Sequence, residues 1–65
     1  MQAHQLRVIE ERQELDEKRA KLTAFIGGDI YRKLDHVEQS RLNRQLEAMT
    51  LYSNILVERI GAFAE

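Results

Sequence analysis

The side chains of this sequence that could bind a charged ligand are mainly arginines set at helical spacing. Arg12 and Arg19 stand one heptad apart, at positions where a helix seam would carry apolar residues. A guanidinium group binds phosphate oxygens with two parallel hydrogen bonds, and the faces of Arg and Tyr stack on nucleobases. The predicted ligand-binding residues are Arg12, Lys18, Arg19, Gln45, Tyr52 and Arg59. These residue types indicate a ligand that carries phosphate and a planar group.

A second interpretation of the two seam arginines needs no ligand. Arg12 and Arg19 can pair with carboxylates of the chain and extend their charged ends to water. The candidate partners are Glu11, Glu47 and Glu58. Both interpretations stay open, because a buried guanidinium requires an anion that either the protein or a ligand can provide.

No combination of residues predicts catalysis or a metal centre. His4 and His36 stand far apart and the chain has no cysteine, so the ligand spacing of a zinc site is lacking. The pair Gly27-Gly28 lies in no phosphate-loop pattern. Five acidic residues alternate with basic ones in a way typical of a solvated helix face. They are Glu10, Glu11, Glu14, Asp16 and Glu17. We expect no catalytic residue, no metal and no cofactor.

The charge balance argues against two classes of partner. Ten basic and eleven acidic residues nearly cancel, whereas nucleic acids and anionic membranes attract a basic excess. A helix-turn-helix pattern is also lacking, which disfavours a DNA-binding regulator. The N-terminal stretch MQAHQLRVIEE lacks the apolar core of a signal peptide, and no apolar run approaches the ~18 residues of a membrane span. We expect a cytoplasmic protein that binds neither DNA nor membranes.

Two long helices must position these residues. Val8, Leu15 and Leu22 recur every seven residues and predict a helix over about 3–26. The pair Gly27-Gly28 predicts a left-handed residue that ends this helix. Asp35 and Glu38 form a capping-box pattern that predicts a second helix over about 36–63.

The segment 27–35 must then reverse the chain. Asp29 is expected to cap a short helical turn over 30–34, in which Ile30, Tyr31 and Leu34 cover the end of the hairpin. The sequence therefore predicts one all-α domain over 1–65, an antiparallel two-helix hairpin with a short connecting turn or helix.

The second helix carries more apolar surface than one neighbour can cover. Its seam has 4-3 spacing, and its members are Leu42, Leu46, Met49, Ser53, Leu56, Ile60 and Phe63. Leu51, Tyr52, Ile55 and Val57 lie outside this seam. Since 65 residues without a disulfide form a small core, we expect a helical-bundle homo-oligomer. The predicted interface residues are Leu46, Met49, Leu51, Tyr52, Ser53, Ile55, Leu56 and Ile60. The expected assembly is an antiparallel dimer of hairpins, or a tetramer or larger.

From His4 to Phe63 the chain resembles a family of short tailed-phage proteins described as related to a crAss-like phage protein. The resemblance rests on an ordered set of short motifs. They are Val8-x-x-Glu11, Glu14-Leu15-x-x-Lys18, Leu22-x-x-Phe25-Ile26, Gln45-Leu46-x-x-Met49-x-x-Tyr52-Ser53 and Arg59-Ile60. The resemblance implies a viral accessory protein that acts in a bacterial cytoplasm, and it assigns no catalytic residue.

In that context two functions compete. The first is an anti-defence protein that sequesters a host immune signalling nucleotide, either a cyclic oligonucleotide or an ADP-ribose derivative, in pockets at the oligomer interface. The alternative is an oligomeric protein–protein interaction module that inhibits a host protein or serves as a structural or replication accessory. A nucleotide-binding pocket lined by Arg and Tyr would distinguish the first from the second.

Overall fold

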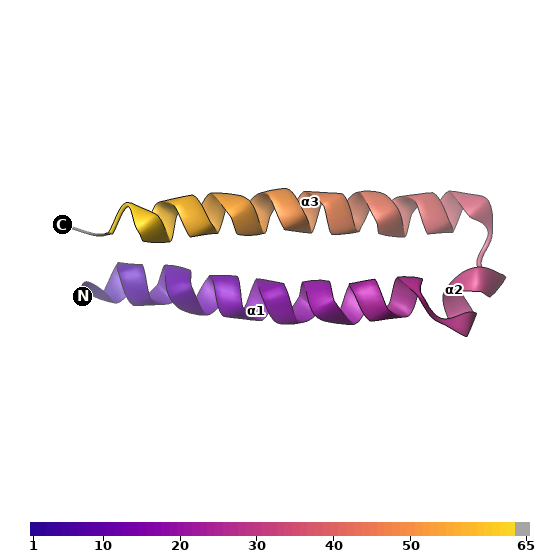
Figure 1. Ribbon diagram of the computed structural model, residues 1–65, viewed down its shortest axis with the longest axis horizontal. Coiled ribbons are helices and arrows are strands. Elements are labelled where there is room, and N and C mark those ends of the chain that lie inside the picture. Colours follow the sequence, from indigo (N-terminus) through magenta and orange to yellow (C-terminus); the bar gives the residue numbers. More distant parts are fainter. Residues whose placement is uncertain (64–65) are drawn as a thin grey trace.

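Three helices follow one another and form a long antiparallel hairpin (Figure 1). The computed structural model describes residues 1–63. Helix α1 spans Ala3–Ile26, the short α2 spans Asp29–Lys33 and α3 spans His36–Gly61. Figure 1 shows α1 and α3 side by side along their length, with α2 at the closed end. The predicted all-helical hairpin is confirmed.

Helix α3 begins where the capping pattern predicts. The Asp35 carboxylate accepts a hydrogen bond of 2.8 Å from the backbone N–H of Glu38, which satisfies one of the unpaired donors of the first turn. At the other end, α3 stops at Gly61, two residues before the expected Phe63. Backbone bonds from the Ala62 N–H to the carbonyls of Glu58 and Arg59, at 3.0 and 3.2 Å, close the last turn.

The glycine pair ends α1, but by a different geometry from the predicted one. Neither glycine has a positive φ, so the expected left-handed residue is wrong. Gly27 stays helical with φ −82° and ψ −1°, and Gly28 is extended with φ −98° and ψ 176°. The physical requirement at Gly28 is space, because an added Cβ would lie 3.3 Å from the carbonyl oxygen of Phe25.

Asp29 does not cap the short helix. Gly28 occupies the N-cap position of α2, and Asp29 is the first helical residue. The Asp29 carboxylate instead accepts a hydrogen bond of 2.6 Å from Arg32 one turn later. The predicted cap is therefore wrong, although an acidic residue in the first turn still suits the positive end of the helix.

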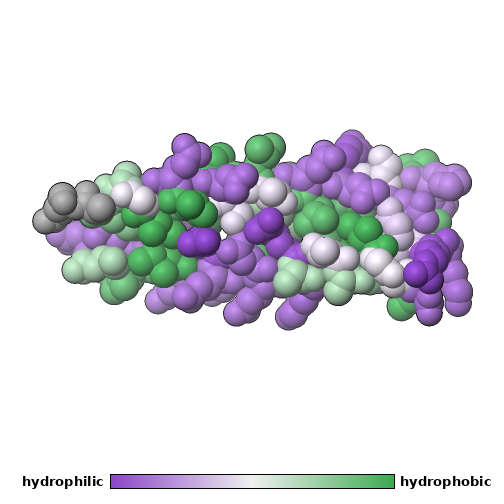
Figure 2. All heavy atoms as spheres, in the orientation of Figure 1, coloured by the Kyte–Doolittle hydropathy of each residue, from purple (hydrophilic) through white to green (hydrophobic). Residues whose placement is uncertain are grey.

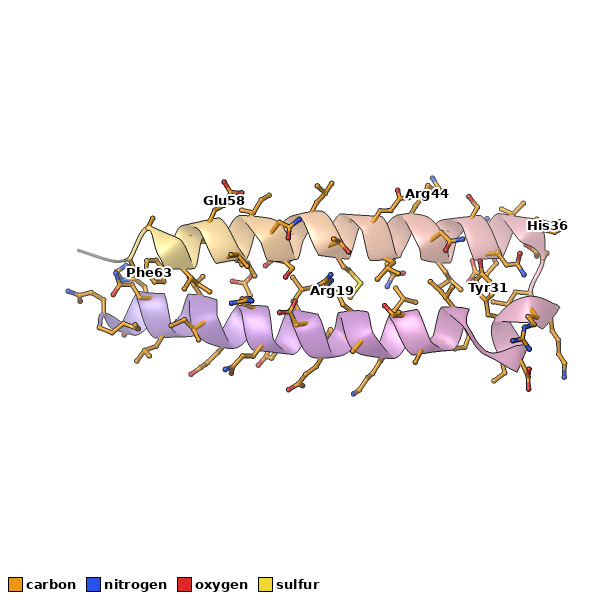
Figure 3. All side chains as sticks on the ribbon, in the orientation of Figure 1. Arg19, Tyr31, His36, Arg44, Glu58 and Phe63 are labelled. Atoms are coloured by element: carbon orange, nitrogen blue, oxygen red, sulfur yellow. The ribbon has the colours of Figure 1, made fainter. Side chains whose placement is uncertain are left out.

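The closed end of the hairpin is tied to α3 mainly through Tyr31, which points from α2 toward α3 in Figure 3. Its carbonyl oxygen accepts from the Gln39 side chain and its hydroxyl accepts from the Asn43 side chain, both at 2.9 Å. Leu34 is half-buried beside it. Ile30 was expected to share this role but is 65% exposed, because α2 directs it to the outer side.

The core lies along the line where α1 faces α3. Val8, Leu15 and Leu56 are buried, and three half-buried apolar side chains pack against them. These are Met49, Ile60 and Phe63. Leu56 is 0% exposed and Ser53 is 3% exposed within the single chain. Both were expected at the interface between copies, but they face α1 inside the hairpin instead.

Much of the apolar surface of α3 stays uncovered. Leu51, Tyr52, Ile55 and Val57, expected outside the seam, are all exposed in the single chain. None of the helices in residues 1–63 is both long and apolar enough to cross a membrane.

Candidate functional site

A cluster of three charged side chains lies at the middle of the hairpin. Arg12, Asp16 and Arg19 occupy consecutive turns of one side of α1, since the spacings of four and three residues return to the same side. The Arg19 Nη1 atom donates to Asp16 Oδ1 at 3.0 Å, and Arg12 Nε lies 3.4 Å from Asp16 Oδ2. Asp16 therefore holds one arginine on each side.

Helix α3 completes this cluster with two hydroxyl groups. The buried Ser53 hydroxyl donates to Asp16 Oδ1 at 2.7 Å. Arg19 reaches the same hydroxyl from Nη1 at 3.5 Å and the Thr50 hydroxyl from Nη2 at 3.4 Å. Figure 3 shows Arg19 in the space between the two long helices. The group of Arg12, Asp16, Arg19, Thr50 and Ser53 is called the arginine cluster below.

The two arginines keep unused donors. Both Nε atoms are buried without a hydrogen-bond partner in residues 1–63. Arg12 Nε forms an ion pair with Asp16 at 3.4 Å but no hydrogen bond. No hydrogen bond from the terminal nitrogens of Arg12 is formed within the described residues either, whereas Arg19 donates to three oxygens. Arg12 is thus the arginine better placed to bind an added anion.

Asp16 stays ionised in this environment. The hydrogen bond from Ser53 lowers the pKa of the Asp16 carboxyl below its ordinary value of 3.8, and the bond and charge of Arg19 lower it further. A carboxylate held in this way is a weak proton acceptor near neutral pH, so its role is to bind cations and hydrogen-bond donors. The arginine cluster is suited to binding.

An open groove borders the arginine cluster on the outer side of α1. Its volume is about 860 Å³, and it is lined by Ile9, Arg12, Gln13, Asp16, Glu17, Ala20 and Ile60. Small-molecule sites typically occupy about 300–1,000 Å³ and combine apolar walls with a few polar groups. Figure 2, in the orientation of Figure 1, shows hydrophobic patches on either side of a largely hydrophilic middle. The groove offers apolar contacts from Ile9 and Ile60 beside the guanidinium group of Arg12.

The remaining predicted ligand residues lie on the opposite face. Each of them stands one position before a residue that faces the other long helix or belongs to the arginine cluster, as Lys18 stands before Arg19 and Tyr52 before Ser53. The other two are Gln45 and Arg59. One residue is a rotation of about 100° around a helix. Because α1 and α3 are antiparallel, this rotation takes all four to the same side of the hairpin, away from the arginine cluster. None of them lines the groove. They are called the tyrosine face below.

The sequence did not identify the anion that holds the two arginines. Glu11, Glu47 and Glu58 were expected to pair with them, but Asp16 is the partner in the described residues. Asp16 was assigned to a solvated acidic face, and Ser53 to an interface between copies. The sequence did contain an indication of this pairing, because Asp16 follows Arg12 by four residues and precedes Arg19 by three, which are the spacings of side chains that meet on a helix.

No group of three or more His, Asp or Glu side chains in residues 1–63 could hold a metal ion. His4 and His36 are both exposed, and His36 lies at the start of α3 (Figure 3).

One comparison with known proteins gives a match. The model of the family described as Sequestin matches residues 2–62, which is nearly the entire chain. This match does not support the expected assignment to a crAss-like phage family, and the phage origin stays a prediction. No curated protein and no solved structure matches.

Proposed function

Because the chain belongs to the Sequestin family, we propose that it is a binding protein that sequesters a small signalling nucleotide without converting it. The family name supports sequestration, and the types of the candidate site residues support the ligand class. Guanidinium groups bind phosphate, and a base can contact either the apolar walls of the groove or, on the opposite face, Tyr52. The proposed ligand is a signal of host immunity, a cyclic oligonucleotide or an ADP-ribose derivative, bound in the cytoplasm of a phage-infected bacterium.

The observation that carries this proposal is the state of Arg12. Its side chain is 43% exposed at the groove, and its terminal nitrogens form no hydrogen bond within residues 1–63, so they are the donors that a ligand can reach. Asp16 fixes the position of the guanidinium group, so a ligand phosphate would meet a preorganised donor and lose little further side-chain entropy. Asp16 also accepts hydrogen bonds, so it can bind a ribose hydroxyl or an amino group of a base.

Assembly would add to this site. A groove open on one hairpin becomes a pocket when a second copy covers it, and exclusion of water strengthens the contact between phosphate and arginine. The tyrosine face, with Lys18, Gln45, Tyr52 and Arg59, contains the same residue types and could bind the ligand at such an interface. The proposal therefore includes two candidate faces, and mutation can distinguish them.

The test is a thermal-shift screen against cyclic di- and trinucleotides and cyclic ADP-ribose isomers. A ligand that binds only the folded state stabilises it by about 2.7 kcal/mol at a hundredfold excess over Kd, so Tm should rise. Arg12→Ala should abolish the shift if the ligand occupies the groove. Tyr52→Ala and Arg59→Ala should abolish it if the ligand occupies the tyrosine face. Ligand released by heating should be intact.

A matched control for Arg12→Ala is Arg41→Ala. Arg41 is an exposed arginine of α3 that pairs with Glu38 and lies far from the groove, so its loss should leave the shift unchanged. A ligand recovered in altered form would contradict sequestration and indicate an enzyme. If no nucleotide changes Tm, the proposal is wrong.

The second candidate function is a protein–protein interaction module that blocks a host protein or serves as a phage accessory. The exposed apolar residues of α3, above all Leu51 at 66% and Ile55 at 53%, favour it. This function predicts no thermal shift with nucleotides and specific capture of one host protein by the folded wild type but not by an α3 surface variant.

A further inference from the structure

A line of residues with 4-3 spacing runs along the side of α3 that faces away from α1. Its members are Arg44, Ala48, Leu51, Ile55 and Glu58, and they are called the back stripe below. This spacing keeps them on one side of the helix, in the pattern that helices use to pair along their length. Figure 3 shows Arg44 and Glu58 both directed away from α1. One side of α3 therefore packs against α1 in the core of the hairpin, and the back stripe on the other side is free to pack against another helix.

The composition of the back stripe changes along its length. Its middle is apolar, with the small Ala48 beside Leu51 and Ile55, which are 66% and 53% exposed. One end carries the cation Arg44 and the other the anion Glu58. Neither forms an ion pair within residues 1–63. Arg44 and Glu58 are fourteen positions apart, which corresponds to about 21 Å along the helix, so these two side chains cannot pair with each other in one chain.

We infer that the back stripe pairs with the same stripe of a second copy, with the two α3 helices antiparallel. A two-fold axis near Leu51 brings each Arg44 close to Glu58 of the other copy, because these residues stand seven before and seven after Leu51. The two ion pairs then flank a middle in which Leu51 and Ile55 of both copies bury their side chains. A parallel pairing would instead place Arg44 against Arg44 and Glu58 against Glu58.

The helix that covers the back stripe is best supplied by another copy of this chain, because the stripe carries a cation at one end and an anion at the other and so complements itself when antiparallel. An unrelated helix could cover Leu51 and Ile55, but it would need its own anion and cation at matching positions. The chain has a net charge of −1, so two copies repel each other only weakly. Ala48 allows close approach of the helices near the middle. This inference goes beyond the proposed function, since the pairing requires no nucleotide.

The test is analytical ultracentrifugation of charge variants without nucleotide. Arg44→Glu and Glu58→Arg each turn two attractive contacts into two repulsive ones, so each should weaken the homodimer about tenfold or more. An equimolar mixture of these two variants should form a heterodimer, because both contacts between unlike chains are then attractive. The double variant Arg44→Glu/Glu58→Arg should restore the homodimer. Circular dichroism establishes that each variant is folded.

A matched pair of neutral variants tests the apolar middle. Ile55→Gln should weaken the dimer, whereas Val57→Gln should not, because Val57 is an exposed β-branched residue on a different side of the same helix. A folded wild type that stays monomeric at every accessible concentration would overturn the inference. It would also be overturned by folded charge variants that associate like the wild type or fail to form the heterodimer. A thermal shift lost in Arg12→Ala but unchanged in Arg44→Glu would separate the ligand site from this interface.

Discussion

Asp16 connects the two long helices at the scale of single residues. It is the acceptor for Arg19 from its own helix and for Ser53 from α3, at 3.0 and 2.7 Å. A seam arginine would be costly without an anion beside it, and Asp16 provides that anion one turn away. The cluster keeps two guanidinium groups near the groove, so the same contacts serve the fold and the proposed site.

This arrangement was predictable only in part. The heptad spacing of Val8 and Leu15 indicated two seam arginines, and Arg19 does reach Ser53 and Thr50 of α3, whereas Arg12 is 43% exposed and pairs with Asp16 of its own helix. The spacing did not identify Asp16, because several carboxylates of α1 lie one turn from an arginine. The choice among them depends on Ser53, which is 37 residues away and meets Asp16 only once the hairpin has formed.

The lowered pKa of Asp16 makes a prediction about pH. The folded state holds this carboxyl in its ionised form, so its pKa is below the ordinary value of 3.8. The stabilisation is therefore complete above pH 3.8 and is lost as the pH falls through the lowered pKa. Asp16→Asn should lower Tm near neutral pH, and the difference from wild type should shrink in acid. Glu17→Gln, a change of charge at an exposed neighbouring position, is the control.

The cause of the pKa shift can be tested separately. Ser53→Ala removes the hydroxyl that contributes most, so the Asp16 carboxyl should titrate at a higher pH, nearer its ordinary value. An NMR titration of the side-chain carboxyl carbon measures this directly. An unchanged titration of Asp16 in the folded variant would show that Arg19 and Arg12 hold the carboxylate without Ser53.

At the scale of elements, the turn shows how a correct prediction can rest on a wrong mechanism. The glycine pair was expected to end α1, and it does. The expected reason was a left-handed residue, yet both glycines have negative φ. The presence of glycine alone could not show the sign of φ, because glycine occurs both in left-handed turns and in turns with no room for a Cβ. The relevant contact, between Gly28 and the carbonyl oxygen of Phe25, exists only in the folded turn.

The two glycines should therefore respond differently to alanine. Gly27→Ala adds a Cβ at ordinary contact distance, 3.7 Å from the nearest atom, at a φ that alanine readily adopts. It should stabilise the hairpin by about 0.4–1 kcal/mol, since alanine restricts the unfolded chain. Gly28→Ala should lower the stability relative to Gly27→Ala, because its Cβ would crowd a backbone oxygen at 3.3 Å. Urea denaturation of both variants measures the difference, and equal free energies of unfolding would contradict this account.

At the scale of the whole molecule, a long hairpin has little interior. The molecule measures 49 × 15 × 14 Å, so most side chains remain near solvent. Only Val8, Leu15 and Leu56 are buried apolar side chains in the described residues. The sequence predicted this limit from chain length and the absence of cysteine. The spacing also separated the seam, where Ser53 and Leu56 are buried, from Leu51 and Ile55, which are exposed. It did not show that Ser53 and Leu56, also expected at the interface between copies, are already buried within one hairpin.

Such a small core makes the hairpin sensitive to one substitution. Leu56 is the apolar residue with 0% exposure, and truncating a buried leucine to alanine costs about 2–5 kcal/mol. A chain of this size derives only about 3–5 kcal/mol from its core, so Leu56→Ala should be largely unfolded at 25 °C when dilute.

Leu6→Ala makes the same chemical change at a half-exposed position of α1 and should keep most of the helical signal. Circular dichroism at 222 nm compares the two variants at equal concentration. If Leu56→Ala melts like Leu6→Ala, the line of contact between α1 and α3 is not the main source of stability. Stability would then depend chiefly on association through the back stripe, and the Tm of Leu56→Ala should rise steeply with protein concentration.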